Sequence, residues 1–287
     1  MKLGMNMLLW TDDVADPRHH RLLEEVAEAG YDGIEVPIFA LDPAPYERLA
    51  GRLEALGLEA QALTAPGPGT NPISPDPAER ALALERSLRS LECARATGAE
   101  IIGGPFQAAP TVFTGAAPTA DERAWAIEGL RTLAEAAEPL GLTLALESLN
   151  HFEHYLTTTA AETAAMCRDV GHPRCRMLYD TFHANIEEKS VREAIEGCAD
   201  VLAYVHVSES DRSIPGTAQV DWATTFETLH RVGYDGWLTV EAFGNSHPEL
   251  ERQMRLWRRR FRSESELLRE GAAFLREAWS EAALSSR

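Results

Sequence analysis

Short apolar segments alternate with longer amphipathic segments along almost the whole chain. The short segments have the length and composition of buried strands, and the longer ones repeat apolar positions with the 3.6-residue period of a helix. The predicted strands are residues 2–10, 33–39, 58–63, 100–106, 142–148, 175–180, 201–209 and 237–243. The predicted helices are residues 17–30, 45–57, 78–98, 119–141, 159–171, 190–200 and 221–233, and two further helical stretches follow the last strand, the second of them residues 261–282.

The order of these segments predicts eight strand–helix units, in which crossover helices join parallel strands. Eight units in 287 residues match the size of a (β/α)8, or TIM, barrel. We therefore predict an α/β fold in which residues 1–287 form one domain. Its extra C-terminal helix packs outside the barrel or closes its base. The main alternative is an open doubly wound sheet. That fold normally has a Gly-rich phosphate turn after its first strand, where this chain has WTDDVADP.

Composition narrows the possible partners and the compartment. A net charge of −18 disfavours nucleic acids and anionic membranes as partners. The basic segment RLWRRRFR, residues 255–262, follows a helical pattern and is interpreted as a solvated or packing face. No apolar stretch approaches the ~20 residues of a membrane helix, and MKLGMNMLLW lacks the features of a signal peptide. Four cysteines without metal-type spacing are expected to be buried free thiols, so we expect a cytoplasmic protein.

Candidate chemistry lies where the last four predicted strands end, because active sites of such barrels lie at the C-terminal ends of the strands. Those strands end, in order, with Glu147, Asp180, His206 and Glu241. Three carboxylates brought together would repel one another unless a cation lay among them. Three carboxylates with one imidazole and no thiolate suit Mn²⁺ or Mg²⁺, or Co²⁺, better than a structural zinc. In the alternative interpretation, Glu147 and Glu241 only pair with arginines on the rim.

The segment LYDTFHANIEE, residues 178–188, begins as a strand and ends in polar residues. Asp180 stands at the predicted strand end, and His183 follows it by three positions. Glu187 and Glu188 are interpreted as the start of the next helix, where acidic side chains interact favourably with the positive end of the helix dipole. We therefore expect Asp180 to take part in the chemistry and the two glutamates to take none.

Five motifs in the second half of the chain resemble the ketose 3-epimerases of the xylose isomerase-like barrel superfamily. This group includes D-tagatose, D-psicose (allulose) and L-ribulose 3-epimerases. The motifs are ESLN, DTFHANIEE, HVSESDR, GTAQVD and VEAF. The resemblance covers nearly the whole chain and is strongest between residues 147 and 243. It implies that Glu147, Asp180, His206 and Glu241 bind the metal, that Glu147 and Glu241 are also the acid/base pair, and that Glu153, His183 and Arg212 contact the substrate.

The implied reaction inverts C3 of a ketose through an ene-diolate. The C3 proton is too weakly acidic for a carboxylate of ordinary pKa ~4.3 to remove unaided, so a divalent cation must polarise the carbonyl. One glutamate then removes the proton, and the other returns one to the opposite face. Aldose–ketose isomerisation and elimination from a 3-keto-glycoside remain alternatives on the same site. A non-catalytic sugar-binding barrel is the alternative from another class.

The sequence also bears on the substrate and on the assembly. Residues 244–246 form too short a Gly/Ser segment for a phosphate loop, so we expect an unphosphorylated ketose. The resemblance implies a homodimer or homotetramer. Ser208 stands where many relatives have glycine, Ala218 replaces a glycine of the GTGxVD motif, and Asn6 stands near a position that is often aromatic. We expect these departures to line the far end of the substrate, away from the metal site.

Overall fold

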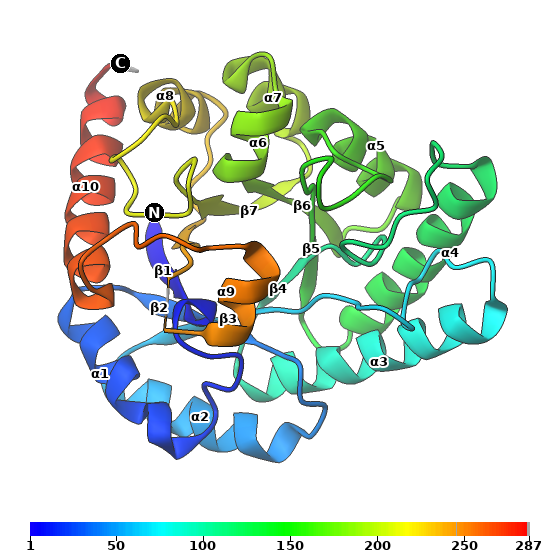
Figure 1. Ribbon diagram of the computed structural model, residues 1–287, viewed down its shortest axis with the longest axis horizontal. Coiled ribbons are helices and arrows are strands. Elements are labelled where there is room, and N and C mark those ends of the chain that lie inside the picture. The colour runs from blue at the N-terminus through cyan, green and yellow to red at the C-terminus, as the bar shows by residue number, and fades with distance from the viewer. Residues whose placement is uncertain (245, 286–287) are drawn as a thin grey trace.

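The computed structural model describes residues 1–244 and 246–285; Asn245, part of the segment considered above for phosphate binding, lies outside them. Its strands form a closed parallel barrel in chain order, in which β1 also pairs with β8 (Figure 1). The predicted (β/α)8 fold is therefore confirmed. The strands are β1 (Lys2–Asn6), β2 (Gly33–Pro37), β3 (Glu59–Leu63), β4 (Ile101–Gly104), β5 (Thr143–Glu147), β6 (Cys175–Asp180), β7 (Leu202–Val207) and β8 (Trp237–Val240).

An outer ring of helices surrounds the barrel, and shorter helices follow some of the strands (Figure 1). Capping boxes at Thr119 and Thr159 begin two of the ring helices, and left-handed Gly57 and Gly171 end two of them. Among the described residues, no helix is long and apolar enough to cross a membrane. The ring helices are α1 (His20–Glu28), α2 (Pro43–Leu56), α3 (Pro77–Ala96), α4 (Ala120–Ala137), α5 (Ala160–Val170), α7 (Val191–Cys198), α8 (Trp222–Arg231) and α10 (Glu264–Ser285). The shorter ones are η1 (Met7–Leu9), η2 (Pro17–His19), α6 (Thr181–Glu187) and α9 (Pro248–Met254).

The C-terminal helix α10 packs on the outside of the barrel beside α8. The rings of Trp222 and Phe274 meet edge-on at 5.7 Å, as do those of Phe226 and Trp279. The Tyr31 hydroxyl also donates a hydrogen bond to the Leu268 carbonyl. Of the two placements expected for this helix, the outer one is therefore correct, and α10 completes the helical ring.

The barrel interior is built in layers, because side chains two positions apart on a strand point to the same face. Ala145, Leu178, Tyr204 and Trp237 form a buried cluster of strand residues, and the Tyr204 hydroxyl hydrogen-bonds Thr239 Oγ1 at 2.8 Å. The predicted ligands Glu147, Asp180 and His206 lie two positions beyond Ala145, Leu178 and Tyr204, and Glu241 lies four positions beyond Trp237. The period of the strand therefore directs all four toward the barrel axis, nearer the C-terminal ends.

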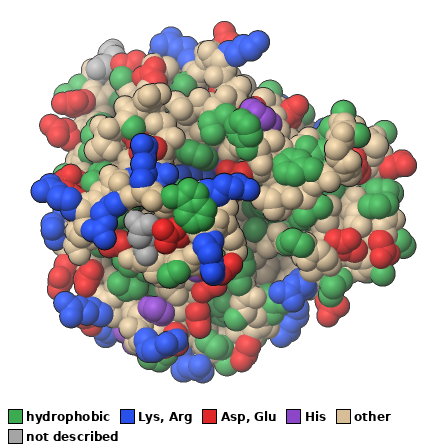
Figure 2. Space-filling view, in the orientation of Figure 1, with side chains coloured by type: hydrophobic (Ala, Val, Ile, Leu, Met, Phe, Trp, Pro, Cys, Tyr) green, Lys and Arg blue, Asp and Glu red, His purple; other side chains and the backbone are tan. Residues whose placement is uncertain are grey.

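Two expectations about local structure were wrong. The basic segment 255–262 is an irregular connection between α9 and α10 and not a helix. Figure 2 shows Lys and Arg side chains gathered on this face, consistent with a solvated surface. Glu187 and Glu188 lie at the end of α6 and do not begin the next helix. The Glu188 carboxylate instead accepts a hydrogen bond from the Ala160 N–H, so it caps the start of α5.

Candidate active site

The four predicted ligands converge at the C-terminal end of the barrel. Glu147 and Asp180 are the last residues of β5 and β6, His206 is the penultimate residue of β7, and Glu241 directly follows β8. Each residue is at most 7% exposed. One ligand atom from each residue can be chosen so that all four lie within 4.8 Å of one another.

His206 presents a free ring nitrogen to this cluster. Its Nδ1 lies 3.8 Å from Glu147 Oε1, 3.7 Å from Asp180 Oδ2 and 3.7 Å from Glu241 Oε2. This nitrogen is buried and has no hydrogen-bond partner among the described residues. A buried polar atom without a partner is costly unless something else binds it. Together with three carboxylates, the free nitrogen makes a donor set that can hold a divalent cation.

Asp180 divides its two carboxylate oxygens between the fold and the cluster. Its Oδ1 accepts the backbone N–H groups of Phe182 at 2.6 Å and His183 at 3.0 Å, which caps the start of α6. Its Oδ2 faces His206 and accepts a hydrogen bond from the Ser208 hydroxyl at 2.9 Å. The helix cap therefore fixes the direction in which the second oxygen points.

The buried carboxylates perturb one another. Burial, reinforced by the Glu241 carboxylate, raises the pKa of Glu147 well above its ordinary range. Burial acts in the same direction on Glu241, but the Arg212 guanidinium and His206 outweigh it and hold the pKa of Glu241 low. Burial alone would lower the pKa of His206, but Glu35 and Glu241 outweigh it and raise that pKa. The cluster thus concentrates negative charge that a bound cation would compensate.

Arg212 reaches the cluster from the loop after β7. Its guanidinium donates hydrogen bonds to Glu241 and, at 3.1 Å, to Asp180 Oδ2. The Phe182 and Phe243 rings lie 4.0 and 4.9 Å from the guanidinium carbon, so aromatic faces enclose the charge. The backbone of Arg212 has φ of 61°, in the left-handed region. Its N–H and C=O are both hydrogen-bonded, which holds this conformation in place.

His183 is placed as a hydrogen-bond donor toward the cluster. Its Nδ1 accepts the backbone N–H of Asn150 at 3.0 Å, and burial lowers the pKa of its imidazole. A neutral ring that accepts at Nδ1 carries its proton on Nε2. That Nε2 lies 3.7 Å from Glu147 Oε1 and 3.1 Å from Arg212 Nη2. The His183 ring and the Arg212 guanidinium therefore lie side by side at the edge of the cluster, where an acceptor oxygen would relieve the close approach of two N–H donors.

Glu153 belongs to the same group through Asn150. The Asn150 side-chain amide donates to Glu153 Oε1 at 2.8 Å and lies 2.9 Å from His183 Nδ1. The structure thus brings together all seven residues named from the sequence. The contribution of Asn150 was missed, although the residue stands in the ESLN motif.

The expectation about Ser208 and Asn6 was wrong. The Ser208 hydroxyl contacts Asp180 and Arg212. The Asn6 side-chain amide donates to Glu241 Oε1 at 3.0 Å. Both residues therefore adjoin the predicted ligands rather than a distant part of a substrate site.

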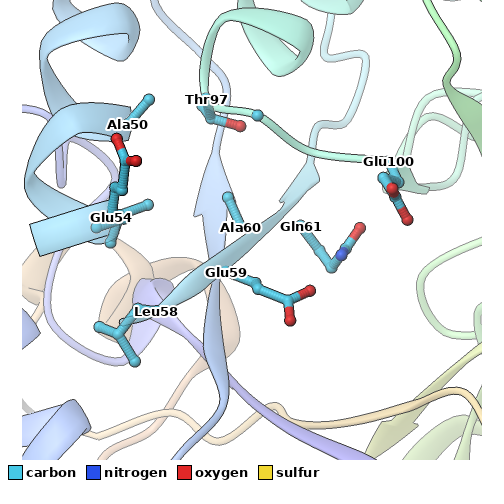
Figure 3. A pocket seen from close by; sticks show the side chains of 10 residues that line it. Ala50, Glu54, Leu58, Glu59, Ala60, Gln61, Thr97 and Glu100 are labelled. Carbon is cyan, nitrogen blue, oxygen red and sulfur yellow. The ribbon is translucent and has the colours of Figure 1, made fainter. Parts of the chain in front are cut away.

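A separate cavity of about 290 Å³ lies near the opposite ends of the strands, between β3 and α2 (Figure 3). Its lining includes Glu54, Glu59 and Glu100. Glu59 pairs with Lys2 at 2.6 Å, and the side-chain oxygen of Gln61 accepts the Ile101 N–H. These groups are partnered at the N-terminal end of the barrel, so this cavity is not part of the cluster described above.

Comparison with known proteins identifies the family. A model of the xylose isomerase-like TIM barrel family matches residues 23–278. An L-ribulose 3-epimerase from Mesorhizobium japonicum is 33% identical over 279 residues, which cover 96% of this chain and 93% of the relative. The chain belongs to the ketose 3-epimerase family. A ketose 3-epimerase from Arthrobacter globiformis is 31% identical over 281 residues, or 96% of each chain.

Solved structures of ketose 3-epimerases share the whole barrel. An L-ribulose 3-epimerase structure has a TM-score of 0.93 and 31% identity, and covers 99% of this chain and 96% of its own. A D-allulose 3-epimerase from Methylomonas sp., solved in complex with D-allulose, has a TM-score of 0.88 and 27% identity over 97% of each chain. The resemblance inferred from the five motifs is therefore confirmed.

Proposed function

We propose that this chain is a divalent-metal-dependent isomerase that inverts C3 of an unphosphorylated ketose of the L-ribulose, D-psicose or D-tagatose type. The observation that carries the proposal is the buried group of Glu147, Asp180, His206 and Glu241, with two hydrogen-bond donors beside it. Membership of the ketose 3-epimerase family supports the same reaction. These four residues would hold Mn²⁺, or Mg²⁺ or Co²⁺. The bound ion would polarise the sugar carbonyl and stabilise the charge of the ene-diolate.

Glu147 and Glu241 are the proposed acid/base pair. They come from β5 and β8, so they approach the barrel axis from different sides. One carboxylate removes the C3 proton from one face of the sugar, and the other supplies a proton to the opposite face. Removal of the proton from one face and return of a proton to the opposite face invert the carbon centre. Burial of both groups keeps bulk water from competing for the proton.

His183, Arg212 and Glu153 are proposed to hold the substrate. The His183 Nε2 and the Arg212 Nη2 lie side by side at 3.1 Å, and a sugar oxygen would accept hydrogen bonds from both. Two donors directed at the developing oxyanion lower the barrier to proton removal. Glu153 would accept a hydrogen bond from a sugar hydroxyl while Asn150 keeps its carboxylate in place.

Isotope exchange tests this proposal. Enzyme loaded with Mn²⁺ is incubated in D₂O with L-ribulose, D-psicose and D-tagatose in turn, and NMR follows deuterium at C3. We expect label at C3 together with the C3 epimer for at least one ketose. Glu241→Gln should lose this exchange, whereas Glu196→Gln, an exposed control, should keep it.

Other outcomes of the same experiment would indicate other reactions. Label at C1 with formation of an aldose would indicate aldose–ketose isomerisation. Release of a leaving group from a 3-keto-glycoside would indicate elimination. Absence of exchange at C3 with every free ketose would refute the epimerase proposal.

We also propose that the protein assembles as a homodimer or homotetramer. Phe152 and Trp257 are 70% and 69% exposed; Phe152 lies on the loop after β5 and Trp257 between α9 and α10, where a second copy would cover them. The helix α10 already packs against its own barrel, so these loops are the better candidates for the contact. Light scattering coupled to size exclusion would measure the mass. A species of 31.6 kDa would refute assembly.

A further inference from the structure

Glu35 is a fully buried carboxylate that the proposed chemistry does not use. It lies in the middle of β2, with 0% of its surface exposed. The strand register places it beside Asn6 of β1 and Gln61 of β3. Burying a carboxylate is costly unless hydrogen bonds or charges compensate it. Such a residue in a barrel core therefore calls for a specific partner.

The partner of Glu35 is the predicted ligand His206. Glu35 Oε1 lies 3.0 Å from His206 Nε2, and both side chains are buried. The backbone of β4 leaves room for this contact at Gly103. A Cβ atom there would lie 2.9 Å from a Leu178 methyl carbon and 3.6 Å from Glu35 Oε1. A larger residue in place of Gly103 would therefore crowd both side chains.

The two ring nitrogens of His206 face different surroundings. Nε2 faces Glu35, whereas Nδ1 faces the carboxylates of Glu147, Asp180 and Glu241 and has no hydrogen-bond partner among the described residues. A neutral imidazole carries one N–H and one lone pair. A carboxylate that accepts the Nε2–H leaves the lone pair on Nδ1, which is the form that binds a metal.

We propose that Glu35 is a positioning residue that holds His206 in the orientation and tautomer needed for metal binding through Nδ1. This inference rests on the proposed metal centre and extends it to a residue outside the ligand set. Glu35 makes no contact with the reacting sugar in this role. It acts through His206, so its effect is on the binding of the metal itself.

Metal affinity in the absence of sugar tests the inference. Mn²⁺ binding to chelator-treated protein is measured by calorimetry for the wild type, Glu35→Leu, Glu35→Gln and the control Thr239→Val. We expect Glu35→Leu to bind Mn²⁺ roughly 10- to 100-fold more weakly. Glu35→Gln keeps a carbonyl acceptor and should lose less. Thr239 is equally buried and bonds Tyr204, so Thr239→Val should stay within about threefold of the wild type.

A spectroscopic readout separates positioning from packing. In the Co²⁺-loaded wild type, the Nε2–H of a histidine bound through Nδ1 should give one strongly shifted proton resonance that disappears in D₂O. This resonance should be lost or should exchange rapidly in Glu35→Leu and be unchanged in Thr239→Val. In Glu35→Gln it should remain but shift, because the acceptor has lost its charge. The glutamine variant carries the test if the leucine variant fails to fold.

Several results would overturn the inference. One is a folded Glu35→Leu variant whose Mn²⁺ affinity lies within threefold of the wild type. Another is a Co²⁺ spectrum of Glu35→Gln identical to that of the wild type. A wild type that binds neither ion overturns this inference and the metal centre together. Failure of C3 exchange with normal Mn²⁺ binding would instead refute only the proposed reaction, because none of these measurements uses a sugar.

Discussion

Replacement of Arg212 by methionine isolates the contribution of one buried cation to the site. Methionine keeps much of the side-chain length but removes the hydrogen bonds to Asp180 and Glu241. The three side chains are at most 8% exposed, so solvent screens these interactions little. Removing one partner of a buried ion pair costs about 3–5 kcal/mol. At about 2 °C per kcal/mol for a chain of this size, the melting temperature in EDTA should fall by roughly 6–10 °C.

The same variant should respond differently to metal. In this variant the carboxylates of Asp180 and Glu241 have lost their guanidinium partner. A bound divalent cation would supply positive charge to them, so saturating Mn²⁺ should restore part of the lost stability. Activity should not return. One donor to the developing oxyanion is missing, which costs roughly 10²- to 10³-fold in kcat. Thermal melts in EDTA and in Mn²⁺, followed by circular dichroism, measure the first effect, and initial rates measure the second.

Arg168→Met is the matched control, because Arg168 pairs with Asp200 at the surface, where the two side chains are 44% and 61% exposed. An exposed pair contributes about 0–1 kcal/mol, so this variant should melt within about 2 °C of the wild type. If Arg212→Met in EDTA melts as close to the wild type as this control does, the guanidinium does not compensate the buried carboxylates and the electrostatic reasoning fails.

Four further substitutions probe the site and the loop that follows β7. Asp180→Asn should lose Mn²⁺ binding and turnover together, whereas His183→Ala should keep Mn²⁺ binding and lose turnover. Calorimetry measures the Mn²⁺ affinity of each variant, and initial rates measure turnover. Equal loss of Mn²⁺ binding in both variants would contradict the assigned roles. Ser208→Gly removes the hydroxyl that donates to Asp180 and should weaken Mn²⁺ binding roughly tenfold; unchanged affinity would make that bond irrelevant to the metal. Burial raises the pKa of Glu209, but hydrogen bonds from four backbone N–H groups and from the Trp222 indole outweigh it and lower that pKa. The Glu209 carboxylate therefore stabilises the fold at neutral pH, and this stabilisation is lost as pH falls through the lowered pKa. Glu209→Gln should therefore cost about 3 kcal/mol at pH 7 and less at pH 3, as urea unfolding at the two values would show; a cost that grows on acidification would refute this.

The sequence was informative about the ligands because the geometry of a strand determines where its last residues point. Glu147, Asp180 and His206 each end an apolar segment, and parallel strands of one barrel end at the same side. Three consecutive strands therefore bring their terminal side chains together without any knowledge of loop conformation. Glu241 is the residue directly after β8, so its side chain lies at the same end of the barrel.

Glu35 was missed for a related reason. Strands of a parallel barrel are buried on both faces, so their sequences lack the polar alternation that would show which side chains point inward. One hint of which side chains point inward was the two-residue spacing on neighbouring strands. Gly4 and Asn6 of β1 stand two positions apart, as do Gly33 and Glu35 of β2, so each pair lies on one face of its strand. That spacing becomes readable only once the strand register is known.

The helix α6 was missed because strand and helix share a residue. Asp180 ends β6 and also caps α6, so no polar loop separates the two elements. Glu188, just after α6, shows another limit of reasoning from local sequence. Its side chain caps the start of α5, which lies 28 positions earlier in the chain. Only the folded ring places α5 and the end of α6 side by side.

The closure of the ring between β1 and β8 has a consequence for how the protein is made. Of the barrel strands, β1 is synthesised before the others and pairs with the last, β8, and Asn6 meets Glu241 across that seam. A nascent chain that still lacks β8 leaves β1 and β7 with unpaired edges, which are prone to associate with other chains. The site cannot assemble before the seam closes. Premature termination before Trp237 would therefore yield both an inactive product and a hazard for aggregation.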